Sequence, residues 1–303
     1  MATTVRPGPG VEKPGAGRTL RTYLELAKLR IVTLLLFTTV TAMIVAAQGI
    51  PALSVLLPTL IGGALSAMGA SALNQYLDRD LDAKMTRTAR RPIPSGRVSP
   101  TNALLFGLAL IVWSTLILWI LVNPLTALLA LGGAIYYVVV YTALLKRNTV
   151  VNILIGGGAG AMPVLVGWAA VTGGLSYEAL ILFAIIFYWT PPHSWALALL
   201  VNSDYSRANV PMMPVARGED ITRRQILLYA IQLVIISLLP VLFGFLGGIY
   251  LVAAVALGVG LIRASVILIR RRDGASARKT YKFSTAYLAF LFMAMIIDTL
   301  LLA

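Results

Sequence analysis

The residues best suited to chemistry lie in the segment NQYLDRDLDAKMTRTARRPIPSGR, residues 74–97, which follows a stretch without a single charge. Asn74, Asp78 and Asp82 recur at every fourth position. On an α-helix four residues turn about 40° past a full rotation, so these side chains form one slowly drifting stripe, with Asp80 on the other side. Carboxylate and amide oxygens are hard ligands, and Mg²⁺ is normally held by one or two carboxylates together with substrate phosphates. The stripe therefore predicts a magnesium site.

Basic side chains crowd the same segment. Lysine and arginine can bind the non-bridging oxygens of a diphosphate and stabilise the charge of that group as it leaves. A second interpretation stays open, in which the segment is only a solvated loop between membrane helices. Carboxylates contribute little to the orientation of a membrane protein, however, so orientation alone does not explain three aspartates here. The candidate diphosphate ligands in this segment are Lys84, Arg87, Arg90 and Arg91.

A second polar cluster reads TPPHSWALALLVNSDYSRANVPMMPVARGED, residues 190–220. Asp204 follows a charge-free span and precedes Arg207, so it is either a residue at the end of a helix or the second half of a metal–diphosphate site. His193 is the only histidine of the chain and lies in an apolar stretch. An ionisable group there is a functional hypothesis by default. It could ligate a haem iron or form a hydrogen bond at the Pro191–Pro192 kink.

These clusters must be positioned by membrane helices. The chain has 303 residues, of which 59% are hydrophobic and 12% charged, about half the charged fraction of a soluble domain. Charge-free stretches are long enough to cross a bilayer as helices. The sequence therefore predicts an all-α polytopic membrane protein with nine transmembrane helices in one domain, residues 29–303. The nine spans are about 29–48, 53–77, 103–122, 125–145, 150–172, 178–201, 225–244, 247–269 and 283–302.

The positive charge is distributed with a strict alternation. All 25 Lys and Arg residues lie in five segments: the N-terminal segment up to Arg30, the segments after spans two, four and six, and the run from Arg263 to Lys282. The other connectors have none. The positive-inside rule then predicts a multi-pass protein of the cell (inner) membrane with a cytoplasmic N-terminus and an external C-terminus. This distribution explains the net charge of +14 without a nucleic-acid partner. The Gly- and Pro-rich residues 1–28 are expected to form a disordered cytoplasmic tail.

Two stretches carry a specific resemblance. The pattern N-x-x-x-D-x-x-x-D followed by R-P-I-P-S-G is similar to the first aspartate motif of the UbiA-type intramembrane prenyltransferases, which are nine-helix enzymes that transfer a prenyl group from its diphosphate. The segments YTALLKRNTVVNILIGGGAGAMPVLVGW and WTPPHSWALALLVNSDYSRANVPMMPV resemble the haem-farnesylating branch, the haem O synthases. Most members of the wider family have a second motif with two or more aspartates. Here Asp204 is followed four residues later by Ala208, which leaves the number of metal ions open.

The resemblance implies the transfer of a farnesyl group from farnesyl diphosphate to a vinyl group of haem B, with addition of water, giving haem O for terminal oxidases. It favours His193 as a ligand of the haem iron, with a hydrogen-bonding role at the Pro191–Pro192 kink as the alternative. It suggests a haem A synthase or an oxidase-assembly protein as partner. It further implies that Mg²⁺ is held by Asn74, Asp78, Asp82 and Asp204. The diphosphate ligands expected on this basis are Lys84, Arg87, Arg91, Lys146, Arg147 and Arg207.

Two other functions stay open at this point. One is a related prenyltransferase that acts on a quinone precursor or another aromatic acceptor, which the TPPH segment and the lone Asp204 disfavour. The other is a cation-coupled transporter, which would place its functional carboxylates near the middle of the membrane. Tyr136, Tyr137 and Tyr141 are interpreted either as packing residues or as ring faces that stabilise a cation.

Overall fold

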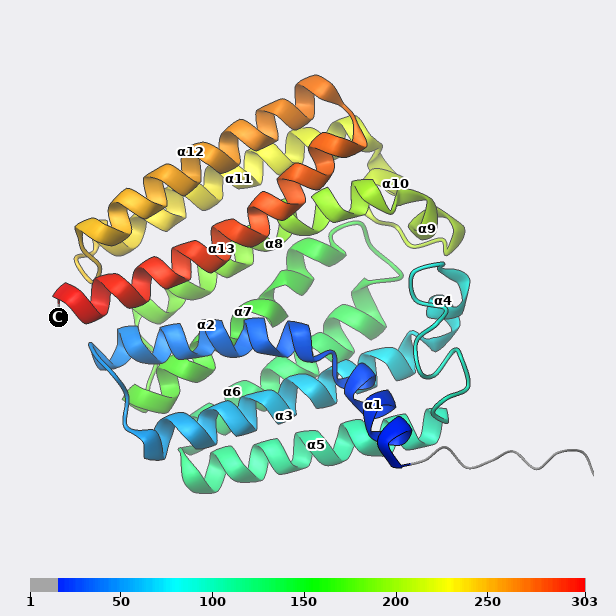
Figure 1. Ribbon diagram of the computed structural model, residues 1–303, viewed down its shortest axis with the longest axis horizontal. Helices are drawn as coiled ribbons and strands as arrows, with labels where there is room; N and C mark the ends of the chain where they lie inside the picture. Colours follow the sequence, from blue (N-terminus) through cyan, green and yellow to red (C-terminus); the bar gives the residue numbers. More distant parts are fainter. Residues whose placement is uncertain (1–15, 303) are drawn as a thin grey trace, which may run out of the picture.

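The computed structural model describes residues 16–302, which form helices and no strands (Figure 1). Nine helices in this part of the chain are long and apolar enough to cross a membrane, which confirms the nine predicted spans. The seventh and ninth begin earlier than predicted, because the hydrogen-bonded helix continues past the apolar stretch into charged residues. The spans are α2 (Leu29–Ala47), α3 (Leu53–Leu77), α5 (Pro100–Leu121), α6 (Pro124–Ile135) continued by the π-helix η1 (Tyr136–Leu145), α7 (Asn152–Thr172), α8 (Tyr177–Leu200), α11 (Glu219–Leu242), α12 (Gly248–Arg271) and α13 (Gly274–Leu302).

Four shorter helices lie outside the spans: α1 (Ala16–Ala27), α4 (Arg79–Lys84), α9 (Asn202–Arg207) and α10 (Met213–Arg217). All four lie at the same end of the bundle, together with the 146–151 connector and the α12–α13 turn (Figure 1). The connectors without Lys or Arg lie at the opposite end, where α13 also ends. The structure therefore gathers the two polar clusters of the sequence at one end of the bundle.

Helix α1 corrects the prediction of a tail that is disordered up to residue 28. Residues 1–15 lie outside the described residues, but residues 16–27 are helical. The side chain of Leu26 is fully buried, and its carbonyl oxygen accepts hydrogen bonds from Ser71 Oγ and Gln75 Nε2 of α3, each 2.9 Å long. These contacts hold α1 against the bundle.

The helices pack closely where small residues face one another, as expected for membrane bundles. A Cβ atom on Gly69 of α3 would lie 2.7 Å from the backbone oxygen of Gly107 on α5. In the other half of the bundle, α8 packs against α7, α11 and α13 around a core that includes the fully buried Tyr250, Tyr287 and Phe292.

Two features depart from regular α-helical hydrogen bonding: the π-helix η1 and the Asp298 carboxylate at the start of α12. In η1, the backbone N–H of Lys146 donates to the carbonyl of Tyr141, five residues earlier. Such π-helical turns are frequent at functional sites. At the other end of the bundle, Asp298 is only 2% exposed because its carboxylate accepts the backbone N–H groups of Gly247 and Tyr250 at the start of α12. Asp298 thus acts as a cap between helices.

Candidate active site

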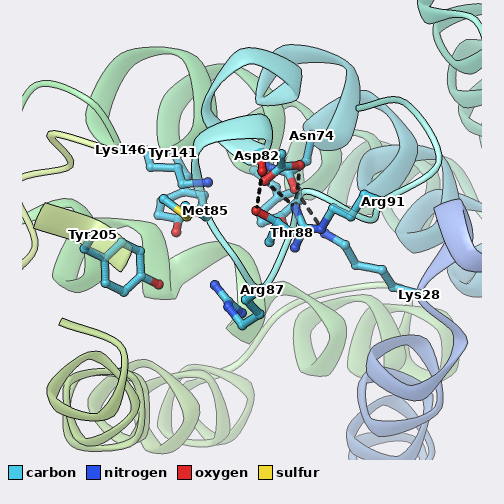
Figure 2. Close-up of a pocket in the computed structure, with 11 residues that line it drawn as sticks. Lys28, Asn74, Asp82, Met85, Arg87, Thr88, Arg91, Tyr141, Lys146 and Tyr205 are labelled. Atoms are coloured by element: carbon cyan, nitrogen blue, oxygen red, sulfur yellow. Dashed lines mark hydrogen bonds and ion pairs between the residues drawn. The ribbon is translucent and has the colours of Figure 1, made fainter. Parts of the chain in front are cut away.

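A polar pocket of about 140 Å³ lies at the end of the bundle where the basic connectors gather. It is built by the α1–α2 junction, the end of α3, the α4 segment with the loop that follows it, the π-helix η1 and α9 (Figure 2). Its lining combines acidic, basic and aromatic side chains: Lys28, Asn74, Asp82, Met85, Arg87, Thr88, Arg91, Tyr137, Tyr141, Lys146 and Tyr205.

Asn74 and Asp78, which belong to the first half of the predicted metal site, are buried and joined by a hydrogen bond. Asn74 Nδ2 donates to Asp78 Oδ2 over 2.9 Å and to Thr142 Oγ1 over 3.1 Å. Lys146 Nζ forms an ion pair with the same Asp78 oxygen. Asp78 is completely buried, and its other oxygen, Oδ1, has no hydrogen-bond partner among the described residues. The only charged group near Asp78 Oδ1 among the described residues is the Arg147 guanidinium at 3.7 Å, so this oxygen keeps a lone pair that a bound cation could use.

Asp82 is held separately from this group. Both of its oxygens accept hydrogen bonds from Arg91 Nη1, over 2.8 and 2.7 Å, and only 2% of the residue is exposed. The expected continuous helix is interrupted, because α3 ends at Leu77 and α4 begins at Arg79. The bonds from Asp78 N to Asn74 O and from Asp82 N to Asp78 O nevertheless keep the four-residue spacing. Asn74 and Asp82 therefore line the pocket, with Asp78 beside Lys146.

The predicted diphosphate ligands divide into two groups. Arg87, Arg91 and Lys146 line the pocket. Lys84 is exposed and lies outside the lining, because α4 turns its side chain towards the surface. The remaining two bases, Arg147 and Arg207, also lie outside the lining and form ion pairs with acidic side chains.

Asp80 is the acidic partner of Arg147. Two hydrogen bonds of 2.8 and 2.7 Å join the two side chains, and this contact lowers the pKa of the Asp80 carboxyl to about 2. Arg147 also approaches Asp78 Oδ1 to 3.7 Å. Asp80 thus holds Arg147 beside the site without lining the pocket.

Lys28 lines the pocket, although the sequence pattern does not single it out from the other bases of the N-terminal segment. It has a left-handed backbone (φ 50°) between α1 and α2, and its Nζ donates to Asn74 Oδ1 over 3.0 Å. Burial, together with the positive charges of Arg91 and Lys146, lowers the pKa of Lys28 to about 7. The only signal in the sequence was its position at the start of the first apolar span, beside Arg30.

Asp204, the second half of the predicted site, is connected to the first half by contacts with the loop that follows α4. Asp204 is buried, and its carboxylate accepts from Arg207, which also donates to Thr86 Oγ1 over 2.7 Å. The backbone N–H of Arg87 donates to the same carboxylate. Asp204 itself does not line the pocket, but its neighbour Tyr205 does.

An apolar cavity of about 420 Å³ adjoins the polar pocket and runs between α2, α3, α6, α7 and α8. Lys28, Tyr137 and Tyr141 line both spaces and so form their boundary. The two tyrosine rings stack with centroids 5.6 Å apart. The glycines of α7 make room for this wall, since a Cβ on Gly156 would lie 2.2 Å from the Tyr141 ring.

His193 of α8 lies in the wall of this apolar cavity. Its ring contacts Trp189, with centroids 4.2 Å apart, and Tyr281 of α13, with centroids 4.7 Å apart. Nδ1 lies 2.9 Å from Ser284 Oγ. The structure therefore places the lone histidine against the apolar space and away from the acidic cluster.

The fit of a divalent cation can be judged from the donor set. Among residues 16–302, no group of three or more His, Cys, Asp or Glu side chains is arranged to hold a metal ion. The three predicted aspartate ligands are thus not preassembled into one cluster. Asp82 is paired with Arg91, and Asp204 is paired with Arg207. Asp78 Oδ1 and the Asp82 carboxylate still offer the one or two hard oxygens that Mg²⁺ needs when substrate phosphates supply the others.

The fold and the site together define a class of protein: an integral membrane bundle with a basic, oxygen-rich pocket that adjoins an apolar cavity. Such a site fits an amphiphile with an anionic head and an apolar chain. The sequence profile of the UbiA prenyltransferase family matches residues 35–296, and the chain belongs to this family.

Curated relatives and solved structures agree with that assignment. The chain is 50% identical to a protoheme IX farnesyltransferase of Chloroflexus aurantiacus over 97% of its own length and 50% of that protein. It is 51% identical to a protoheme IX farnesyltransferase of Symbiobacterium thermophilum over 93% and 95% of the two chains. The chain spans about half the length of several curated relatives. A UbiA homologue from Archaeoglobus fulgidus, solved with DMAPP and Mg²⁺, has the same fold, with a TM-score of 0.67, 17% identity and coverage of 90% and 99%.

Proposed function

We propose that the protein transfers a farnesyl group from farnesyl diphosphate to a vinyl group of haem B and that water adds to the product, giving haem O and diphosphate. The observation that carries this proposal is the pair of adjoining spaces, one polar and one apolar, which share Lys28, Tyr137 and Tyr141. The haem acceptor is supported by the relatives of about 50% identity and by the histidine in the apolar wall.

The polar pocket would bind the diphosphate head. Lys28, Arg87 and Lys146 present positive charge to it, and Arg91 is held in place by Asp82. Such charge-assisted hydrogen bonds are strongest for oxyanions, and they strengthen as negative charge develops on a leaving group. Bound Mg²⁺, held by Asp78 and Asp82 with Asn74 beside them, would supply Lewis-acid stabilisation of the same charge. Asp204 would support the loop that carries Arg87.

The boundary between the two spaces would hold the reacting carbon. When the bond between farnesyl C1 and the diphosphate oxygen breaks, both electrons leave with the diphosphate and the allylic group becomes cationic. The stacked faces of Tyr137 and Tyr141 lie at this boundary and stabilise such a cation through their π electrons. The vinyl group then bonds to C1, water captures the new cation, and a proton is released.

The transporter alternative is not supported by the placement of the acids. Asp78 ends α3, while Asp82 and Asp204 lie in the short helices α4 and α9, so all three are at one end of the bundle. Lys and Arg are concentrated in the connectors at that end. By the positive-inside rule, this supports placing that end, and the N-terminus, on the cytoplasmic side of the cell membrane. A haem A synthase or an oxidase-assembly protein remains the partner that the proposed product suggests.

The test is a reaction with purified protein in nanodiscs. Wild type is incubated with Mg²⁺, farnesyl diphosphate and haem B, and the products are analysed by mass spectrometry. We expect a hydroxyethylfarnesyl haem. An aromatic quinone precursor in place of haem B is the matched control acceptor, and its prenylation without any haem product would overturn the proposed acceptor.

A further inference from the structure

His193 contacts Ser284, a residue that has no role in the proposed reaction. Its Nδ1 contacts Ser284 of α13, which lies 91 positions later in the sequence. Ser284 is completely buried, as expected for a residue in the bundle interior. A hydroxyl can donate or accept a hydrogen bond, so the direction in which its own proton points favours one tautomer of a neighbouring imidazole.

The direction of the hydrogen bonds follows from the single proton of the serine hydroxyl. Ser284 Oγ donates that proton to the carbonyl oxygen of Tyr281 over 2.8 Å. Towards His193, the serine oxygen can then only accept, over the 2.9 Å that separates it from Nδ1. This hydrogen-bond pattern corresponds to the tautomer with the proton on Nδ1 and, in the neutral ring, the lone pair on Nε2.

The same turn of α13 also fixes the plane of the ring. Trp189 stacks on His193 at an interplanar angle of 22°, and Trp189 Nε1 donates to the backbone oxygen of Ser284 over 2.6 Å. Tyr281, whose carbonyl accepts the serine proton, covers the histidine at 34°. The imidazole is thus restrained by two aromatic rings and by the contact at Nδ1.

Nε2 is the nitrogen left for a ligand. No described residue forms a hydrogen bond with it, and it is not one of the fully buried atoms that lack a partner. Because His193 lines the apolar cavity, the free edge of the ring is the edge available to a molecule bound there. An unprotonated Nε2 whose opposite nitrogen donates a hydrogen bond is the usual arrangement of a metal-binding histidine.

We infer that Ser284 is a positioning residue that holds His193 as the Nδ1–H tautomer, so that Nε2 ligates the iron of the porphyrin acceptor. This inference rests on the proposed function. It also narrows the acceptor class to metalloporphyrins with an open axial position, because a metal-free porphyrin offers no Lewis acid to Nε2.

The first experiment reads the tautomer without haem. Because His193 is the only histidine, protein labelled with ¹⁵N-histidine and purified through a histidine-free tag gives signals from one imidazole. We expect the wild type to show a protonated Nδ1 and an unprotonated Nε2, and the Ser284→Ala variant to lose this preference. A wild-type ring protonated at Nε2 would overturn the inference.

The second experiment compares haem B with metal-free protoporphyrin IX by absorbance and fluorescence titration. We expect haem to bind more tightly than protoporphyrin in the wild type, and Ser284→Ala to weaken haem binding by about 10- to 100-fold, the usual effect of removing such an outer partner. Protoporphyrin binding should stay unchanged. The iron–histidine vibration of the ferrous complex, measured by resonance Raman spectroscopy, should be present in the wild type, shifted in Ser284→Ala and absent in His193→Ala.

Controls separate positioning from folding. Ser265→Ala removes a fully buried serine of α12 that bonds only its own helix at Leu261, and it should leave haem binding unchanged. Ser284→Thr keeps a hydroxyl and should restore the tautomer. If the wild type makes haem O while Ser284→Ala keeps wild-type haem affinity and iron–histidine vibration, only this inference fails. If the wild type makes no haem O, the proposed function fails.

Discussion

At the scale of single residues, each site carboxylate already has a basic partner. A buried carboxylate needs such compensation, since an isolated charge in a low-dielectric site is unstable. A magnesium diphosphate carries charges of both signs and can compensate acids and bases together. The pairs are Asp78 with Lys146, Asp82 with Arg91, and Asp204 with Arg207.

Asp78 gives the sharpest test of the predicted metal site. Asp78→Asn keeps the size of the side chain but removes its charge, so we expect turnover to fall by about 100-fold or more, comparable to the loss of a key electrostatic contact. Haem binding and membrane insertion should persist. The measurement is the initial rate of haem O formation as a function of Mg²⁺ concentration.

Asp80→Asn is the matched control for that variant. Asp80 is exposed and pairs with Arg147, and exposed ion pairs contribute at most about 1 kcal/mol, so the rate should change by less than about fivefold. Equal rates for Asp78→Asn and the wild type would remove the metal-site proposal.

Lys28 predicts a pH dependence of substrate binding. Its pKa is lowered to about 7, whereas in an unfolded chain it is near 10.4. A bound diphosphate favours the protonated form, so the affinity is greatest below pH 7. It should weaken by about five- to tenfold between pH 7 and pH 8, as free Lys28 loses its proton. Calorimetric titration with farnesyl diphosphate, without haem, measures this.

The control is Lys28→Arg, whose guanidinium stays charged over this range. Any pH dependence that remains in this variant belongs to the diphosphate itself. The same pKa shift affects stability. The unfolded chain binds more protons between about pH 7 and pH 10, so the Lys28 contribution to the free energy of unfolding rises with pH through that window. If the affinity for farnesyl diphosphate depends on pH in the same way in the wild type and in Lys28→Arg, Lys28 is not the group that causes the pH dependence.

At the scale of helices, the site depends on interruptions of regular structure. Asp78 lies at the break between α3 and α4, and the π-helix η1 carries Tyr137, Tyr141 and Thr142 to the same place. Both elements are held by close helix packing, because α3 lies directly against α5 and η1 against α7.

Gly69 tests this packing. Gly69→Ala would place a methyl group 2.7 Å from the backbone oxygen of Gly107 and 2.8 Å from Ile111 Cγ1. A backbone oxygen cannot rotate away, so α3 and α5 must separate, at a cost of about 1–3 kcal/mol. We expect a lower Tm in detergent and weaker farnesyl diphosphate binding, because Asn74 follows on the same helix.

Gly132→Ala on α6 is the matched control. No atom outside its own helix lies within 4 Å of a Cβ at this position, so the substitution should leave the Tm unchanged or raise it slightly. A Gly69→Ala variant as stable as Gly132→Ala would show that α3 and α5 are packed more loosely than the structure indicates.

At the scale of the whole molecule, orientation decides which compartment supplies the diphosphate. The chain has no cysteine, so single-cysteine labelling needs no background removal. Ile50 is 79% exposed in a connector without Lys or Arg, and Ala275 is exposed beside the basic α12–α13 turn. In intact cells, a membrane-impermeant maleimide should label Ile50→Cys and leave Ala275→Cys unlabelled until the cells are lysed. The reverse pattern would place the site on the external side.

The sequence by itself determined the nine spans and the end of the bundle at which the acidic clusters meet. Span length and charge alternation are local properties of the chain, and the bilayer converts them directly into topology. The helical hydrogen bonds that join Asn74 to Asp78 and Asp78 to Asp82 are likewise kept across the break after Leu77, as the four-residue spacing predicts.

Only the tertiary structure decided which side chains face the pocket. Lys28 reaches Asn74 across 46 positions while Lys84 turns outwards, and Ser284 reaches His193 across 91 positions. Such contacts depend on how each helix is rotated and packed against its neighbours. Hydropathy contains almost no information on that rotation, because lipid and a helix interface are similarly apolar.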